Sequence, residues 1–279
     1  MAKCDLCGEE AGLLRKRHKD CDEKHQAGRT ESIGLVEKSA LLPPDVPALH
    51  LQLAAIAERA FMKPGEDKSI IVEGWQKAVA SALEDDILTV EEEHSLVNFA
   101  DALSLAQEDL DRDGSYSRLA KAAVIREILE GKLPQRVRVV GDLPFNFQKG
   151  ETLVWLFPGT TYCEERTQTH FEGSHQGVSV RVASGLYYRV GGFRGHPVST
   201  SAMVNLGQGS MAITDKHIYF AGPSKSFRVK YEKIVSFVPY SDGIGIQRDA
   251  RTAKPQVFIT GDGWFTYNLV TNLARRAAA

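Results

Sequence analysis

The chain has 279 residues, of which 43% are hydrophobic and 25% charged, and its formal net charge at pH 7 is −2. This composition is ordinary for a globular protein and excludes fibrous, collagen-like and wholly disordered chains. No stretch approaches the roughly 18 apolar residues of a membrane span, and the N-terminus is charged and cysteine-rich, unlike a signal peptide. We therefore expect a cytoplasmic protein, in which clustered cysteines hold metal more often than they form disulfides.

The charges are divided unevenly along the chain. Residues 1–30 have a balance of +1, residues 31–134 carry ten basic and twenty acidic residues, a balance of −10, and residues 135–279 carry seventeen basic and ten acidic residues, a balance of +7. Such blocks are typical of separate domains. Together with the patterns below, they predict a zinc finger over 1–30, a linker over 31–47, a helical module over 48–134 and a β domain over 135–279.

The first segment contains two close pairs of metal-ligand residues. Cys4 and Cys7 flank a tight turn, while His18 and Cys21 open an expected helix, on which residues three apart point the same way. Two pairs of thiolate and imidazole ligands suit tetrahedral Zn²⁺. His25 is the alternative fourth ligand, or a donor beside the site, but the matched pair spacing favours His18. With few apolar residues, this segment needs the ion to fold.

Four or five protein ligands leave no open coordination position, so we expect one structural Zn²⁺ and no catalytic residue. One pair of ligand residues in a turn, followed by a second pair at the start of a helix, resembles the arrangement in treble-clef and zinc-ribbon-like fingers. The adjacent basic stretch Arg15–Lys19, with Arg15, Lys16 and Arg17, suits phosphate contact. Acidic residues on both sides of this stretch favour a solvated surface of mixed charge instead.

Residues 48–134 show apolar positions at helical spacing, which predicts a bundle of four or five helices. Thr89 and Glu92 fit a capping box, and Gly131 and Pro134 are stop signals for the last helix. Residues 83–105 resemble the helical modules of TerB-like proteins. The predicted buried stripes contain Leu49, Leu53, Ile56 and Ala60; Ile71, Trp75, Val79 and Leu83; and Val90, Leu96, Val97, Phe99 and Leu103.

Residues 135–279 change to short stretches of alternating polarity, which predict antiparallel strands. One pair of strands is expected around a turn at Thr214–His217, and a C-terminal helix is expected to bury Phe265, Leu269, Val270 and Leu273. The predicted fold class is therefore α+β, with a C-terminal β-barrel or sandwich capped by a helix. The other expected strands are 137–141, 152–158, 178–183, 186–192, 226–231, 234–240, 243–248 and 256–260.

This strand and helix pattern, clearest over 209–276, resembles bacterial PH-like and GRAM-like domains. The resemblance implies a module for binding or scaffolding rather than for catalysis. The chain as a whole then indicates a non-enzymatic adaptor or regulatory subunit, in a bacterial or phage system, that binds a protein partner.

Two other functions remain open from the sequence. A nucleic-acid-associated protein would contact phosphates through Arg15–Lys19 and the basic C-terminal domain, and a third interpretation is peripheral binding of lipid headgroups. We expect neither membrane insertion nor a small-molecule substrate. The candidate residues for an anion or partner in the β domain are Lys225, Arg228, Lys230, Arg248 and Arg251.

Overall fold

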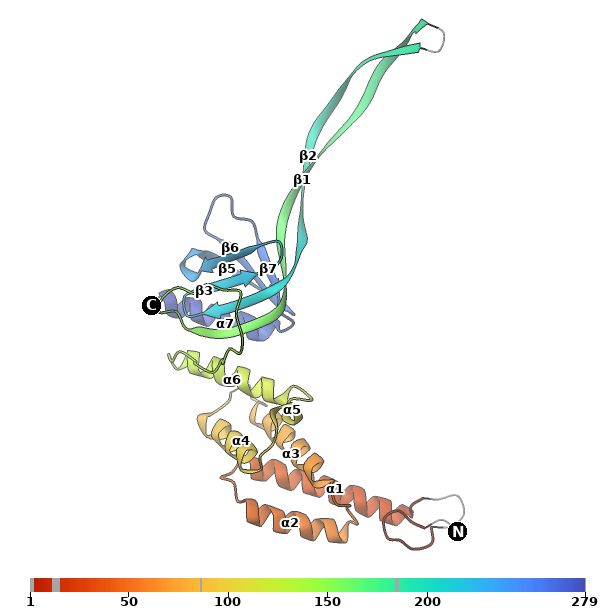
Figure 1. Ribbon diagram of the computed structural model, residues 1–279, viewed down its shortest axis with the longest axis vertical. Helices are drawn as coiled ribbons and strands as arrows, with labels where there is room; N and C mark the ends of the chain where they lie inside the picture. The colour runs from red at the N-terminus through yellow and green to blue at the C-terminus, as the bar shows by residue number, and fades with distance from the viewer. Residues whose placement is uncertain (1–2, 12–15, 86, 184–185, 279) are drawn as a thin grey trace. The chain divides into compact units, whose positions relative to one another are not determined.

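A computed structural model describes residues 3–11, 16–85, 87–183 and 186–278, with the side chains of residues 167–201 outside the description. The chain divides into two compact units, residues 1–130 and residues 131–279 (Figure 1). The first unit combines helices with the cysteine-rich N-terminus, and the second is an antiparallel sheet with one helix. The predicted α+β class is confirmed.

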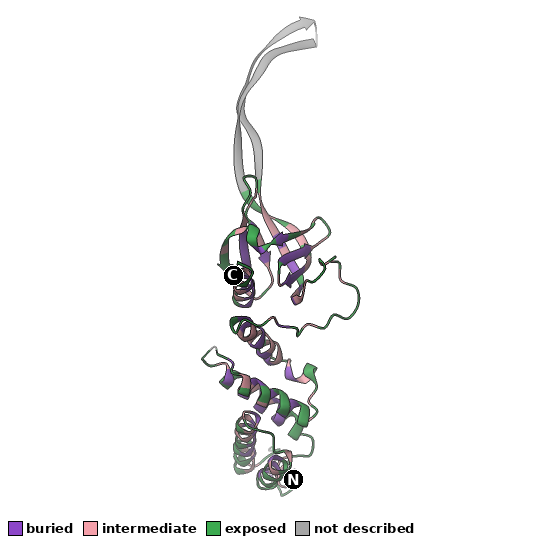
Figure 2. Cartoon of the chain, turned by 90° about the vertical axis from the view of Figure 1, so that its left-hand side faces the viewer, coloured by how far each residue is buried: buried purple, intermediate pink, exposed green. Residues whose placement is uncertain are grey.

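The described part of the first unit is built from helices packed around one core. The core includes Ile70, Trp75, Leu96, Phe99 and Leu119, all almost fully buried, which Figure 2 marks by colour. The helices are α1 (Lys19–Ala40), α2 (Val46–Arg59), α3 (Asp67–Ala82), α4 (Val90–Ala102), α5 (Gln107–Leu110) and α6 (Ser115–Leu129).

Helix α1 differs from the predicted finger and linker. The sequence predicts a finger that ends near Gly28 and a linker over 31–47, whereas α1 continues without a break to Ala40 and buries Ile33 and Val36. The reason is packing: a Cβ at Gly28 would lie 2.2 Å from the Cβ of Ala60. Gly28 therefore allows close helix packing rather than ending the helix.

The signals that begin and stabilise α4 are confirmed. The Thr89 side chain accepts a hydrogen bond from the Glu92 amide, and the Glu92 carboxylate accepts one from the Thr89 amide, which completes the capping box. The predicted burial of Val97 is wrong, because this residue is 39% exposed. The apolar stripe of α4 passes through Leu96 and Phe99 instead, so Val97 lies beside it.

The second unit is a seven-stranded antiparallel sheet with the order β4-β3-β2-β1-β7-β6-β5, curled into a half-barrel (Figure 1). The short turn between Thr214 and His217 is confirmed, since it joins β2 to β3. The strands are β1 (Leu153–Ala183), β2 (Leu186–Thr214), β3 (His217–Ala221), β4 (Ser226–Lys230), β5 (Ile234–Tyr240), β6 (Gly243–Arg248) and β7 (Gln256–Ile259); a 3₁₀ turn (Tyr231–Lys233) precedes β5.

The C-terminal helix α7 (Gly263–Ala278) covers the half-barrel as predicted. Phe265, Leu269, Val270 and Leu273 are all fully buried along one side of it. The Phe265 ring meets the Trp155 ring edge-on, with the centroids 4.8 Å apart. Apolar residues at helical spacing therefore join α7 to β1 and close the core.

One predicted strand is absent. Residues 137–141 alternate valine and arginine as a strand would, but no ladder forms there, and Val140 is 93% exposed. Alternation alone is insufficient, because a strand also needs a partner strand beside it. Farther along this segment, Phe147 packs edge-on against Tyr219 of β3 with the ring centroids 5.1 Å apart.

Glu151 fastens the end of this segment to β3. Its side chain is fully buried and accepts hydrogen bonds from the Tyr219 hydroxyl at 2.6 Å and the Gln148 amide at 3.0 Å, and it pairs with His217. Burial raises the pKa of Glu151, but these hydrogen bonds outweigh burial and hold the pKa below its usual value. The ionised carboxylate is therefore the form that stabilises the fold.

Replacing this carboxylate by an amide should destabilise the second unit by about 2 kcal/mol at neutral pH, because charged hydrogen bonds are lost. The folded-state pKa of Glu151 is lowered, so its contribution is present above the unfolded pKa of about 4.3 and disappears as the pH falls through the folded pKa. Denaturant unfolding of Glu151→Gln and wild type should therefore converge at acid pH. Asp142→Asn, at an exposed position, is the control and should leave stability unchanged.

Candidate metal centre

Cys4 and Cys7 lie in a compact turn at the N-terminus. The Gly8 amide donates to the Cys4 carbonyl at 3.0 Å, and the Cys4 amide donates to the Glu9 carbonyl at 2.7 Å. Gly8 has φ +78°, a conformation that glycine adopts without strain. The Asp5 amide donates to the Lys16 carbonyl at 2.9 Å, which ties the turn to the segment before α1.

His18 and Cys21 come from the beginning of α1. His18 is the N-cap residue and Cys21 lies in the first turn, so both side chains face the turn that carries the other two cysteines. The His18 Nδ1 atom is 3.4 Å from the Cys7 sulfur and 3.6 Å from the Cys21 sulfur. All four ligand atoms of Cys4, Cys7, His18 and Cys21 lie within 4.8 Å of one another.

These distances fit tetrahedral zinc. With Zn–S of about 2.3 Å and Zn–N of about 2.0–2.1 Å, the sulfur and nitrogen atoms of a regular tetrahedron are about 3.5 Å apart. The two measured distances from His18 Nδ1 agree with this spacing. The Cys3His cluster therefore provides all four ligands that a zinc ion would need.

The His18 ring is oriented for ligation. Its Nε2 atom lies 2.9 Å from the carbonyl oxygen of Glu10. A carbonyl only accepts, so Nε2 carries the proton and Nδ1 directs its lone pair at the sulfur atoms. Fixing the ligand ring through a backbone carbonyl is the usual second interaction of a metal-bound histidine.

The electrostatics of the cluster also indicate a cation. Backbone N–H groups, the Cys7 amide above all, lower the pKa of Cys4 to about 6. Burial and the neighbouring Cys7 and Cys4 sulfurs raise the pKa of Cys21 to about 11. Thiolates held this close repel one another, and a divalent cation at their centre would remove that repulsion.

His25 is not part of the cluster. It lies on α1 with 7% of its surface exposed, and its Nε2 atom pairs with a Glu66 carboxylate oxygen at 3.1 Å. Of the two histidines that the sequence leaves open as the fourth ligand, His18 is the one that lies with the three cysteines. The Glu10 carbonyl contact has no signal in the sequence, because any residue supplies a backbone oxygen.

The predicted anion-binding residues belong to both units, and several of them are paired with acidic side chains. Lys16 is exposed, Arg17 forms an ion pair with Asp22 at 3.0 Å, and Arg15 lies outside the described residues. In the second unit Lys225 pairs with Glu164, and Lys230 pairs with Glu232 at 2.8 Å.

The remaining predicted basic residues lie on β4, on β6 and in the loop after β6. Arg228 belongs to β4, at one edge of the sheet, whereas Arg248 ends β6, next to the opposite edge strand. Arg251 is exposed in the loop after β6.

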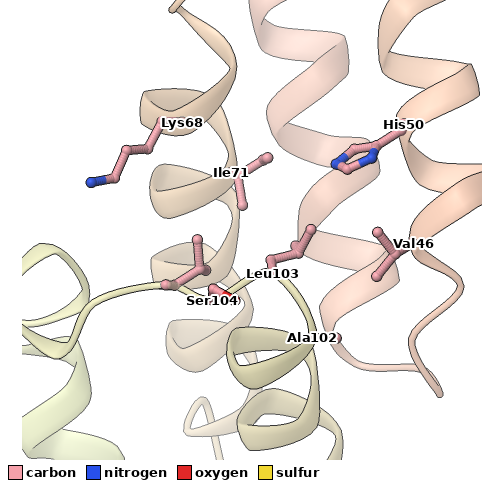
Figure 3. Close-up of a pocket in the computed structure, with 8 residues that line it drawn as sticks. Val46, His50, Lys68, Ile71, Ala102, Leu103 and Ser104 are labelled. Carbon is pink, nitrogen blue, oxygen red and sulfur yellow. The ribbon is translucent and has the colours of Figure 1, made fainter.

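The helical unit contains a shallow pocket. It is lined by residues of α2, α3 and the turn after α4, among them His50, Ile71 and Leu103 (Figure 3). His50 lies across the pocket from Ser104, and Lys68 points to its outer side, where it pairs with Asp109. No thiol or carboxylate is among the residues that line it.

No protein-family model matches the chain, and no curated protein is significantly similar to it. Across the described ranges, none of the helices has both the length and the apolar character needed to cross a bilayer.

Proposed function

We propose that the chain is a non-enzymatic adaptor or regulatory subunit that binds a protein partner and uses one structural Zn²⁺ ion. The observation that carries the proposal is the closed ligand set of Cys4, Cys7, His18 and Cys21. Catalytic zinc has three protein ligands and a free position for water or substrate, whereas four protein ligands leave none. The ion would organise the N-terminal turn against α1.

The finer assignments belong to the same proposal. The sheet order and the capping helix support a PH-like or GRAM-like domain, and the turn-plus-helix ligand pairs support a treble-clef or zinc-ribbon-like finger. The helices of the first unit support a TerB-like module less specifically. A reducing compartment such as the cytoplasm suits four free cysteines. Because one fold hosts many functions, these likenesses favour binding but name no ligand.

Affinity purification of the full chain tests the adaptor proposal. We expect a protein partner at fixed stoichiometry, retained at high salt and after nuclease treatment. Recovery of nucleic acid that is released as salt increases would instead favour phosphate contacts and contradict the proposal. Sedimentation with anionic vesicles would contradict it in favour of lipid headgroups. The Cys163→Ser variant should recover the same partner as the wild-type chain, since Cys163 lies outside the metal cluster.

A further inference from the structure

Strand β5 is an open edge of the sheet with an unusual composition. It is the last strand in the sheet order, and its sequence IVSFVPY contains no charged residue. The opposite edge strand, β4, exposes Arg228 and Lys230, which is how edge strands are normally protected from pairing. Val235 of β5 is 62% exposed and Val238 is 45% exposed. One edge is protected by charge and the other is apolar and accessible.

The register of β5 shows which backbone groups are open. Tyr240 pairs with Gly243 across a two-residue turn, and Phe237 pairs with Ile246. In an antiparallel ladder alternate residues direct their N–H and C=O groups away from the neighbour, which here applies to Phe237 and to the carbonyl of Pro239. A bulge at Val235 and the missing N–H of Pro239 limit the open ladder to a short stretch around Phe237.

A groove runs along this edge beside helix α7. One wall is β5 from Ile234 to Phe237, and the other is a stripe of α7 that includes Tyr267, Thr271 and Ala274. These three residues are small or partly apolar and are spaced by about one or two turns of the helix. The groove therefore offers a surface of mixed apolar and polar character directly next to open backbone groups.

The charge around the groove indicates what would fill it. Glu232 at one end is paired with Lys230, and the Lys230 contact, followed by the charge of Lys233, lowers the pKa of Glu232. Arg275 lines the groove and hydrogen-bonds the Asn272 side chain at 3.5 Å, without an ion pair among the described residues. Positive charge from Arg275 is therefore left for an incoming acidic group.

We propose that the groove between β5 and α7 binds an extended acidic segment of a partner protein, which adds to the sheet beside β5. Its backbone would pair with Phe237, an apolar side chain would enter the groove, and a carboxylate would meet Arg275. A second copy of the chain fits less well, because symmetric pairing would bring the same positive charges together and would place Pro239 where a donor is needed. This inference rests on the proposed adaptor function and names the chemistry of its partner.

A displayed library of random linear peptides, selected on the full chain, tests the inference. We expect enrichment of peptides with acidic and alternating apolar residues. Affinity for the best peptide should fall about tenfold or more in Val235→Lys and in Arg275→Glu, both at exposed positions. Val140→Lys, at the 93% exposed Val140, is the matched control and should bind normally. Hydrogen exchange of the Phe237 amide should slow when the peptide binds.

Three results would overturn the inference. The first is that no peptides are enriched. The second is that Val235→Lys and Arg275→Glu bind the selected peptide as tightly as the wild-type chain does. The third is that the free chain is a dimer, which Val235→Lys converts to a monomer. A stoichiometric partner in affinity purification that still binds both variants would leave the adaptor function intact and refute this groove. Absence of any protein partner would refute the adaptor function, while the peptide selection would still report on the groove.

Discussion

The Cys21→Ser variant is expected to contain no zinc, whereas the wild-type chain should contain one ion per chain. Cys21 supplies one of four ligand atoms that lie within 4.8 Å of one another, and a serine hydroxyl does not replace a thiolate on zinc. The N-terminal turn should lose its order along with the ion, because it is too small and polar to fold alone. Elemental analysis of the purified protein measures the first effect.

Hydrogen exchange measures the second effect. The amides of Cys4, Asp5 and Gly8, which are hydrogen-bonded in the turn, should exchange rapidly in Cys21→Ser. Amides in the second half of α1 should stay protected, since Ile33 and Val36 are held in the helical core.

Two controls accompany the Cys21→Ser experiment. His25→Ala and Cys163→Ser should each retain one zinc ion, because neither side chain belongs to the cluster. Loss of zinc from His25→Ala would mean that the fourth ligand is assigned wrongly. Full zinc content in Cys21→Ser would contradict the whole ligand set.

Replacing Trp75 by alanine should destabilise the helical unit by about 3–5 kcal/mol, the range for a large aromatic side chain lost from a core. Trp75 is fully buried, and its indole N–H donates to the Leu96 carbonyl at 2.9 Å, which joins α3 to α4. Alanine would leave a cavity and remove this hydrogen bond between the helices. Exchange rates of the α4 amides give the change in the free energy of opening.

Trp75→Phe separates the two contributions, because phenylalanine fills most of the space but donates no hydrogen bond. Its cost should be about 1–2 kcal/mol. The other two tryptophans, Trp155 and Trp264, belong to the second unit. The tryptophan fluorescence of either Trp75 variant therefore reports on the second unit alone. Equal stability of Trp75→Ala and wild type would show that this residue is not at the centre of the helical core.

Local signals in the sequence identified much of the helical and β structure. The capping box at Thr89 and Glu92 and the apolar stripe of α7 depend on neighbours within a few turns, so sequence spacing is sufficient to predict them. The alternating strands from β3 to β7 were predictable for the same reason. Their order in the sheet depends on pairing between distant segments, such as β1 with β7, which no local pattern contains.

The length of α1 shows where local signals fail. A glycine usually marks the end of a helix, but Gly28 and Gly74 lie where helices approach closely, and a Cβ at Gly74 would be 2.5 Å from the Cβ of Val36. Residues 137–141 show the opposite failure, with a strand-like pattern and no partner strand. In both places the structure depends on a neighbour that is distant in sequence.

The candidate metal centre was predictable to a greater degree. Ligand type and spacing identified Cys4, Cys7 and Cys21, because few arrangements other than a metal site use such pairs. The choice between His18 and His25 required the fold, since Glu66, which pairs with His25, is 41 residues away. Anion binding by the predicted basic residues stays a prediction, and charge in the sequence does not reveal that Lys225 is already paired with Glu164.

The absorption spectrum of the cobalt-substituted full chain tests the central claim of a closed Cys3His zinc site most directly. Co²⁺ in a tetrahedral site with three thiolates should show strong visible bands together with thiolate-to-metal charge transfer, at one equivalent per chain. The Cys21→Ser variant should lose both features. Weak bands typical of six-coordinate Co²⁺, or a spectrum that Cys21→Ser leaves unchanged, would contradict the site.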